Sequence, residues 1–115
     1  MWLFTRHGFF EAASAGPSAG SLQPSVHLRA RRRSHLRNLQ QALPGLADLP
    51  VEDAGEDGYR LTLHPELWQA VLRRLGSELD YRDFRQAVRE AGRCDRAFWE
   101  KLHEVATAVR AQTGA

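Results

Sequence analysis

The residues with the greatest chemical potential in this sequence are arginines crowded into one short stretch. Five arginines fall within nine residues: Arg29, Arg31, Arg32, Arg33 and Arg37. Planar guanidinium groups bind phosphates through paired hydrogen bonds, and they displace the counterions that surround a nucleic acid. The stretch therefore indicates a polyanion site, if the backbone brings these side chains to one surface.

Residues 26–32 alternate between apolar and basic side chains, which is typical of a half-buried strand. The apolar positions are Val26, Leu28 and Ala30, and the basic positions are His27, Arg29 and Arg31. Side chains on one face of a strand recur about every 7 Å. A second alternating stretch, residues 59–64, adds Arg60 and His64 to the basic face if both strands belong to one sheet. The candidate polyanion-binding residues are therefore His27, Arg29, Arg31, Arg60 and His64.

The same arginines also fit a surface that is neutralised within the protein. Residues 1–46 carry six arginines against Glu11, a local net charge of +5, whereas residues 47–66 carry six acids against Arg60, a local net charge of −5. Glu52 and Asp53 are placed to pair with the arginines, and blocks of charge usually just solvate a surface. Both a polyanion face and an internally balanced face are open at this stage.

Aromatic residues open the chain and have two possible uses. On a single strand over residues 2–13, Trp2, Phe4 and Phe10 share one side and Phe9 lies on the other, unless Gly8 shifts the register. Large aromatic side chains most often belong to the core. An aromatic residue left on an open sheet face would instead stack on nucleic-acid bases or pack in a homodimer.

Other chemistries lack their sequence signals. The five histidines, at positions 7, 27, 35, 64 and 103, have no zinc-site spacing, and Cys94 is the single cysteine. Gly16 and Gly20 lie in a Ser/Ala/Pro stretch without the lysine of a phosphate-binding loop. We therefore expect no metal and no cofactor, and we favour a protein without catalytic activity while leaving an enzyme open.

Length and composition set the class of protein. The chain has 115 residues, of which 43% are hydrophobic, which fits one globular domain over residues 1–115. We find no apolar run near the roughly 20 residues of a membrane span, and Arg6 and His7 interrupt the apolar opening too early for a signal peptide. With one cysteine, no intrachain disulfide forms. These features predict a cytoplasmic protein without a membrane partner.

Periodicity predicts the elements that position the basic residues. Strands are expected over residues 2–13, 26–32, 49–54 and 59–64, with a flexible loop over residues 14–25. Helices are expected after Ser34, from Pro65, after Asp80 and after Asp95. The last helix carries the clearest apolar stripe: Phe98, Leu102, Val105 and Val109.

A faint repeat suggests the fold. The strand at residues 26–32 precedes a helix with a leucine stripe, and the strand at residues 59–64 precedes another helix of the same kind. Two strand–strand–helix units predict an α+β protein with a four-stranded antiparallel sheet and helices on one face. The expected arrangement is a permuted ferredoxin-like ββαββα fold followed by C-terminal helices.

Several fragments are similar to a known family. Trp2-Leu3-Phe4 with Gly8-Phe9-Phe10, Arg29-Ala30-Arg31, Leu79-Asp80-Tyr81 with Phe84, and His103-Glu104-Val105 span nearly the whole chain. Together they resemble a family of small uncharacterised bacterial proteins that open with a WLFTxxGFF-type motif. The chain departs from that pattern at Arg82-Asp83, at Arg85 and at Ala106. The resemblance implies domain boundaries and brings no activity with it.

The sequence thus supports two functions of different classes. The first is a non-catalytic binding module whose basic sheet face contacts nucleic acid or another polyanion, such as an acidic protein partner. The alternative is a homodimeric protein-interaction or structural protein that does not bind nucleic acid. The two differ in whether the arginines meet phosphates or carboxylates.

Overall fold

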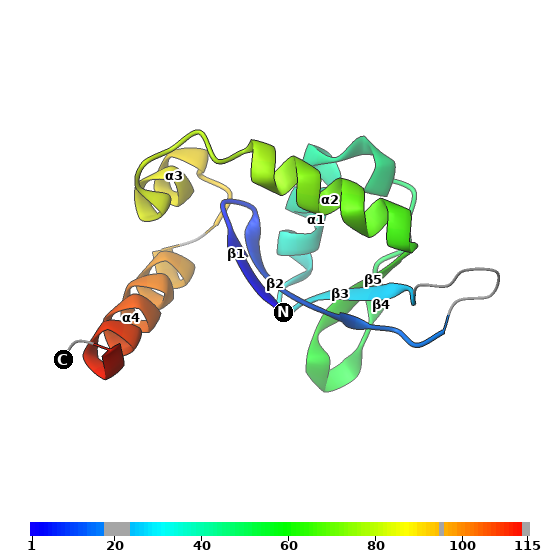
Figure 1. Ribbon diagram of the computed structural model, residues 1–115, viewed down its shortest axis with the longest axis horizontal. Helices are drawn as coiled ribbons and strands as arrows, with labels where there is room; N and C mark the ends of the chain where they lie inside the picture. The colour runs from blue at the N-terminus through cyan, green and yellow to red at the C-terminus, as the bar shows by residue number, and fades with distance from the viewer. Residues whose placement is uncertain (18–23, 95, 114–115) are drawn as a thin grey trace.

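The residues that the structure describes fold into one antiparallel sheet and four α-helices (Figure 1). The computed structural model describes residues 1–17, 24–94 and 96–113. The strands are β1 (Trp2–Thr5), β2 (Gly8–Ser14), β3 (Val26–Ala30), β4 (Glu52–Asp53) and β5 (Tyr59–Leu63). The helices are α1 (Arg33–Ala42), α2 (Pro65–Ser77), α3 (Phe84–Ala91) and α4 (Arg96–Thr113). The predicted α+β class and antiparallel sheet are confirmed.

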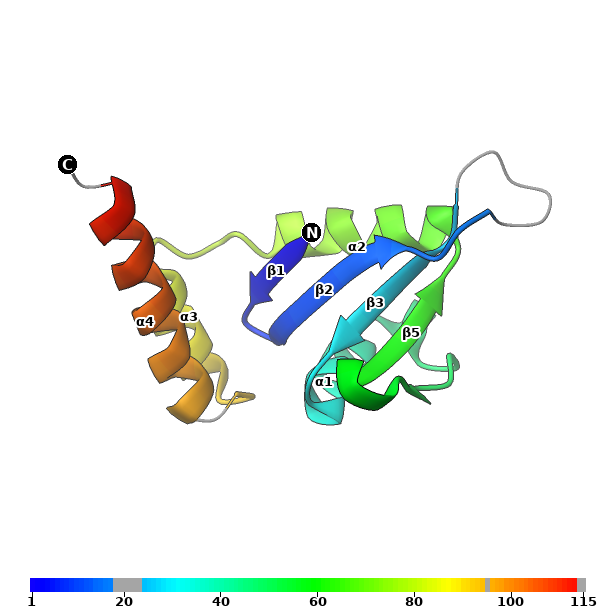
Figure 2. The same cartoon turned by 90° about the horizontal axis from the view of Figure 1, so that it is seen from below.

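The sheet has one covered face and one open face. Its strand order is β1-β2-β3-β5-β4, and every neighbouring pair is antiparallel. Figure 2 looks onto the open face, with α1 and α2 behind the sheet and the α3–α4 pair beside the β1–β2 hairpin. The placement of helices on one face follows from the alternation in the strands, which buries one set of side chains and leaves the other uncovered.

The sheet contains five strands rather than the expected four, because residues 2–13 fold back as a hairpin. Arg6 and His7 form the turn, and Thr5 pairs with Gly8 across it. The Thr5 hydroxyl donates to the Gly8 carbonyl at 3.2 Å and accepts from the His7 amide at 3.0 Å. Gly8 has φ +145°, and a Cβ there would lie 2.3 Å from Cγ of His35. Glycine is needed at this position because the hairpin lies directly on the His35 ring.

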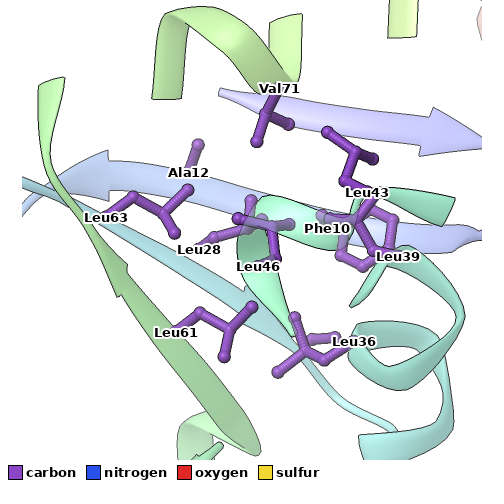
Figure 3. Packing of buried hydrophobic residues seen from close by; sticks show 11 residues of the cluster. Phe10, Ala12, Leu28, Leu36, Leu39, Leu43, Leu46, Leu61, Leu63 and Val71 are labelled. Carbon is purple, nitrogen blue, oxygen red and sulfur yellow. The ribbon is translucent and has the colours of Figure 1, made fainter. Parts of the chain in front are cut away.

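Buried side chains between the sheet and the helices form the core (Figure 3). The inward positions of the strands are Phe10, Ala12, Leu28, Ala30, Leu61 and Leu63. They meet leucines of α1 and of the following 3₁₀ turn, Pro44–Leu46, and Val71 of α2. Each fully buried leucine contributes about 2 kcal/mol, so this layer is the main source of stability.

Helix boundaries agree only in part with the sequence signals. The helix α2 begins at Pro65, and α3 ends at Gly92 with φ +64°, both as predicted. The cap of α3 is Asp83 rather than Asp80, since the Asp83 carboxylate accepts from the backbone amides of the first turn. Ser34 lies inside α1 and does not cap it. Asp95, the predicted cap of α4, lies outside the described residues.

The predicted core stripe of α4 is wrong over its second half. Leu102 is buried, whereas Val105 is 45% exposed and Val109 is 52% exposed. The helix packs on α3, and Phe98 near its start contacts the ring of His35 at 5.1 Å. The apolar period is therefore only partly used for packing.

The predicted loop 14–25 is described only at its two ends. Ser14 completes β2, and the Ala15 amide donates to the Ser25 carbonyl at 2.8 Å. The central part, residues 18–23, lies outside the described residues.

In the described residues, no helix combines the length and the apolar character needed to cross a bilayer.

Candidate binding site on the open sheet face

One row of directly paired residues runs across all five strands on the open face. Trp2 pairs with Glu11, Glu11 with Arg29, Arg29 with Arg60, and Arg60 with Glu52. Each partner in the row comes from the next strand, so the five side chains lie side by side. We define this set as the cross-sheet row.

Two arginines stand next to each other at the centre of the cross-sheet row. Cross-strand neighbours have Cβ atoms about 5 Å apart, and like charges there repel each other. Arg60 lies 3.4 Å from the Glu52 carboxylate, whereas in the described part of the chain Arg29 has no ion pair. The Nε atoms of both arginines are buried and have no hydrogen-bond partner among the described residues. Within the described residues, an ion pair thus forms at Arg60 but not at Arg29.

The pKa of His27 is affected by the positive charges of Arg29 and Arg60. It lies on β3 two residues before Arg29, on the same face, and pairs with Thr62 of β5. Burial lowers the pKa of His27 below its ordinary value, and the nearby Arg60 and Arg29 charges lower the pKa further, against a smaller opposing effect of Glu52. The imidazole is therefore neutral at pH 7 and adds a hydrogen-bonding group to the face rather than a charge.

The remaining two predicted site residues lie beyond the strand ends. Arg31 follows β3 at the margin of the open face, beside Phe9, Glu11 and Arg29, and its guanidinium donates to the Glu56 carbonyl. His64 follows β5 and occupies the exposed N-cap position of α2. The structure thus groups His27, Arg29 and Arg60, places Arg31 at their edge, and leaves His64 on the following helix.

Three aromatic side chains share the open face with the arginines. Trp2 is 69% exposed, and its ring contacts Phe9 edge-to-face at 5.5 Å. Phe4 stacks on Phe9 at 4.6 Å. The expectation that Phe4 and Phe9 lie on opposite sides is wrong, because the hairpin turn reverses the chain and pairs them across β1 and β2. Among the four aromatic residues of the β1–β2 hairpin, Phe10 is the one that points into the core.

Carboxylates balance much of the charge on this face. Glu11 and Glu52 flank Arg29 and Arg60 in the cross-sheet row, so its formal charges cancel. Glu52 also accepts from the Thr62 hydroxyl at 3.4 Å. The face is therefore amphipathic, with aromatic rings at the β1 side and a charge-balanced polar band over β3, β5 and β4.

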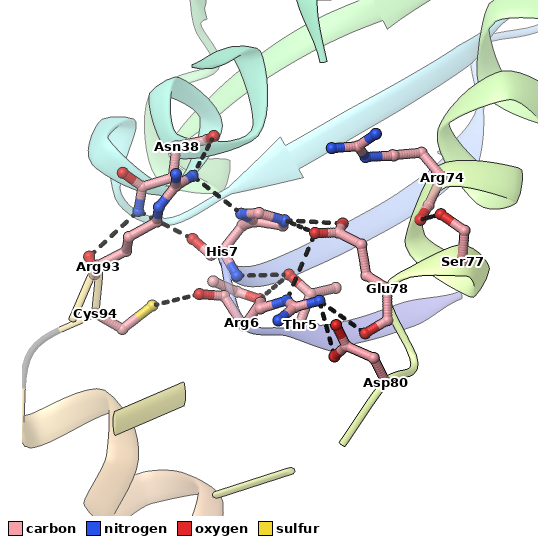
Figure 4. Close-up of polar contacts among 11 residues, drawn as sticks. Thr5, Arg6, His7, Asn38, Arg74, Ser77, Glu78, Asp80, Arg93 and Cys94 are labelled. Atoms are coloured by element: carbon pink, nitrogen blue, oxygen red, sulfur yellow. Dashed lines mark hydrogen bonds and ion pairs between the residues drawn. The ribbon is translucent and has the colours of Figure 1, made fainter. Parts of the chain in front are cut away.

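A second polar cluster, which no sequence pattern indicates, surrounds the turn of the β1–β2 hairpin (Figure 4). His7 is 4% exposed, and its Nε2 lies 3.0 Å from both Glu78 oxygens. Arg6 lies 3.5 Å from Glu78 and 3.3 Å from Asp80. The opposite ring nitrogen of His7 is 3.4 Å from Arg93. We call these residues the hairpin cluster.

The hairpin cluster joins segments that are far apart in the sequence. It links the β1–β2 turn to the end of α2 and, through Arg93 and Asn38, to the segment before α4 and to α1. Its charged groups already pair with one another, so the cluster functions as a structural junction. No local motif marks it, because His7 and Glu78 are 71 positions apart.

The described residues contain no group of three or more histidine, cysteine, aspartate or glutamate side chains arranged to hold a metal ion. In comparisons with protein families, with curated proteins and with solved structures, the chain found no match. We therefore infer the function from the geometry of the open face.

Proposed function

We propose that this protein is a non-catalytic binding module whose open sheet face binds single-stranded nucleic acid. The observation that carries the proposal is the Arg29–Arg60 pair, two adjacent guanidinium groups on an uncovered face. A phosphate between them would relieve their mutual repulsion and accept paired hydrogen bonds.

The aromatic side of the face supports the same proposal. Single strands bind on sheets by stacking their bases on exposed aromatic rings while basic groups contact the phosphates. Trp2 and Arg29 are separated by one strand, about 10 Å by the usual strand spacing. A short segment of single strand can therefore place a base on Trp2 and a phosphate at Arg29.

The strand order and the single cysteine extend the proposal to the scaffold of the face and to the cellular compartment. The order β2-β3-β5-β4, with α1 after β3 and α2 after β5, supports a permuted ferredoxin-like unit to which β1 would add an edge strand. We propose that this unit is the scaffold of the binding face. The single cysteine suits a reducing compartment, so we place the protein in the cytoplasm.

The test is binding of a fluorescent single-stranded oligonucleotide of about 10 nucleotides, followed by anisotropy as salt is varied. Trp2→Ala is expected to weaken binding by about 1–3 kcal/mol for one stacked base. Arg29→Gln is expected to lower the log–log salt slope by about 0.7, which is the value for one phosphate contact on a single strand. The matched control is Arg110→Gln, an exposed arginine in the last turn of α4, which should leave both quantities unchanged.

The charge balance of the cross-sheet row favours a second candidate, a homodimer that packs through the same face. Two copies would bury Trp2, Phe4 and Phe9 without leaving a net charge in the interface. Sedimentation separates the two candidates. A dimer that Trp2→Glu converts to a monomer, together with no oligonucleotide binding at physiological salt, would reject the nucleic-acid proposal and establish the homodimer.

A further inference from the structure

The groove between α3 and α4 is a second site candidate, remote in sequence from the open sheet face. Its cavity volume is about 660 Å³, within the range of small-molecule sites. It is lined by Asp83, Arg85, Gln86, Arg89, Glu90, Trp99 and His103.

The acids of the groove are already occupied by neutral donors. The Asp83 carboxylate caps α3 and accepts from the backbone amides of Arg85 at 3.0 Å and Gln86 at 3.4 Å. Glu90 accepts from the Gln86 side chain at 3.0 Å. In the described part of the chain, neither Arg85 nor Arg89 has an ion pair with a carboxylate. Both guanidinium groups can therefore meet an incoming anion.

Aromatic rings lie beside these guanidinium groups. Arg89 lies over the Trp99 ring at 5.3 Å, and Arg85 contacts the Nδ1 atom of His103. The Trp99 and His103 rings are nearly parallel, with an interplanar angle of 16° and centroids 6.5 Å apart. The His103 ring thus stacks on the Trp99 ring, and the pair gives the groove an aromatic surface against which a planar group can pack.

The indole N–H of Trp99 is an unused donor at this surface. Its Nε1 atom is buried and has no hydrogen-bond partner in residues 1–17, 24–94 or 96–113. A buried indole N–H usually finds an acceptor, because leaving it unpaired costs free energy.

We propose that the α3–α4 groove binds a small planar aromatic ring that carries an acidic group. The ring stacks against Trp99 and His103, and the acidic group pairs with Arg85 and Arg89. Two sources share this chemistry: an aromatic carboxylate and a nucleoside monophosphate. This site is separate from the single-strand face, so the fate of one proposal does not decide the other.

The experiment titrates the full chain with two probes, indole-3-carboxylate and adenosine monophosphate, while the indole N–H resonances of Trp2, Trp68 and Trp99 are followed by NMR. Binding should shift the Trp99 resonance most, and one probe should bind at least about tenfold more tightly than adenosine or inorganic phosphate alone. The preferred probe identifies the source of the acidic group.

The variants test the residues of the groove. Arg89→Gln should weaken the preferred probe by about tenfold or more, and Arg110→Gln, on the same helix pair but outside the groove, should not change its affinity. Circular dichroism checks that both variants keep the fold. The proposal is overturned if neither probe shifts the Trp99 resonance at millimolar concentration, or if Arg89→Gln binds as well as the unaltered chain.

Discussion

Replacing Gly58 by alanine is expected to destabilise the protein much more than the same change at Gly55. Both glycines belong to the turn between β4 and β5, and both have positive φ, +88° and +65°. A Cβ at Gly55 meets nothing within 4 Å, whereas a Cβ at Gly58 would lie 2.4 Å from the Ala30 carbonyl oxygen and 2.9 Å from Cα of Arg31. These neighbours are backbone atoms, which no side-chain rotation can move.

The magnitude follows from two costs. An alanine in the left-handed region costs about 1–2 kcal/mol, and the loss of unfolded-state freedom returns up to about 1 kcal/mol at both positions. Overpacking adds about 1–3 kcal/mol at Gly58 alone. Gly55→Ala should therefore lower the free energy of unfolding by about 1 kcal/mol, and Gly58→Ala by about 3 kcal/mol.

Urea unfolding of the two variants measures the difference directly, with the slope of each transition checked for constancy. Gly58 lies immediately before β5, where that strand meets β3, so the same close approach helps to hold Arg60 opposite Arg29. If the two alanine variants differ by less than about 0.5 kcal/mol, the close contact between the turn and β3 is not present and this reasoning is refuted.

Three further outcomes are expected. The pKa of His27 is lowered in the folded state, so the unfolded chain binds the proton more readily as pH falls past 6.5. In urea titrations between about pH 7.5 and pH 5.5, the His27→Gln variant should therefore lose less stability than the unaltered chain. Glu78→Ala should lower the free energy of unfolding by about 2 kcal/mol, since it removes the acceptor of the buried His7 imidazole. Glu100→Ala, which breaks an exposed ion pair, should cost under about 0.5 kcal/mol. Equal losses would contradict the structural role of the hairpin cluster. On α4, Leu102→Ala should cost about 2–4 kcal/mol and Val105→Ala less than about 1 kcal/mol in thermal unfolding, and a reversed order would contradict the exposure of that helix.

The central strands could be predicted from the sequence because burial on one face imposes a period of two. Leu28 and Leu61 are fully buried and pair with each other across β3 and β5, as their alternating neighbours indicate. The start of α2 at Pro65 could also be predicted, because proline has no backbone N–H that would need an acceptor at the first helical position.

The hairpin could not be predicted because its turn is fixed by distant contacts. Arg6 and His7 are not residues that favour a tight turn, and they are held there by Glu78 at the end of α2. The missed turn accounts for both the missing strand and the wrong face assigned to Phe4 and Phe9.

The sequence predicts which face of the sheet the candidate site residues occupy, but not which residues lie opposite them on the neighbouring strands. The alternation correctly directs His27 and Arg29 away from Leu28. Which residue lies opposite Arg29, and where each strand ends, depend on the pairing of strands that are far apart in the sequence. For that reason the pattern included His64, which the structure places at the N-cap of α2, beyond the end of β5.

The short edge strand β4 has a consequence for how copies of this protein meet at high concentration. It contains only Glu52 and Asp53, and Glu56 and Asp57 follow in the adjoining turn. An exposed sheet edge invites strand addition from another chain, and a brief, acidic edge resists it through repulsion between like charges. This repulsion therefore keeps the hydrogen-bonding groups of the β4 edge from pairing with a strand of a second copy.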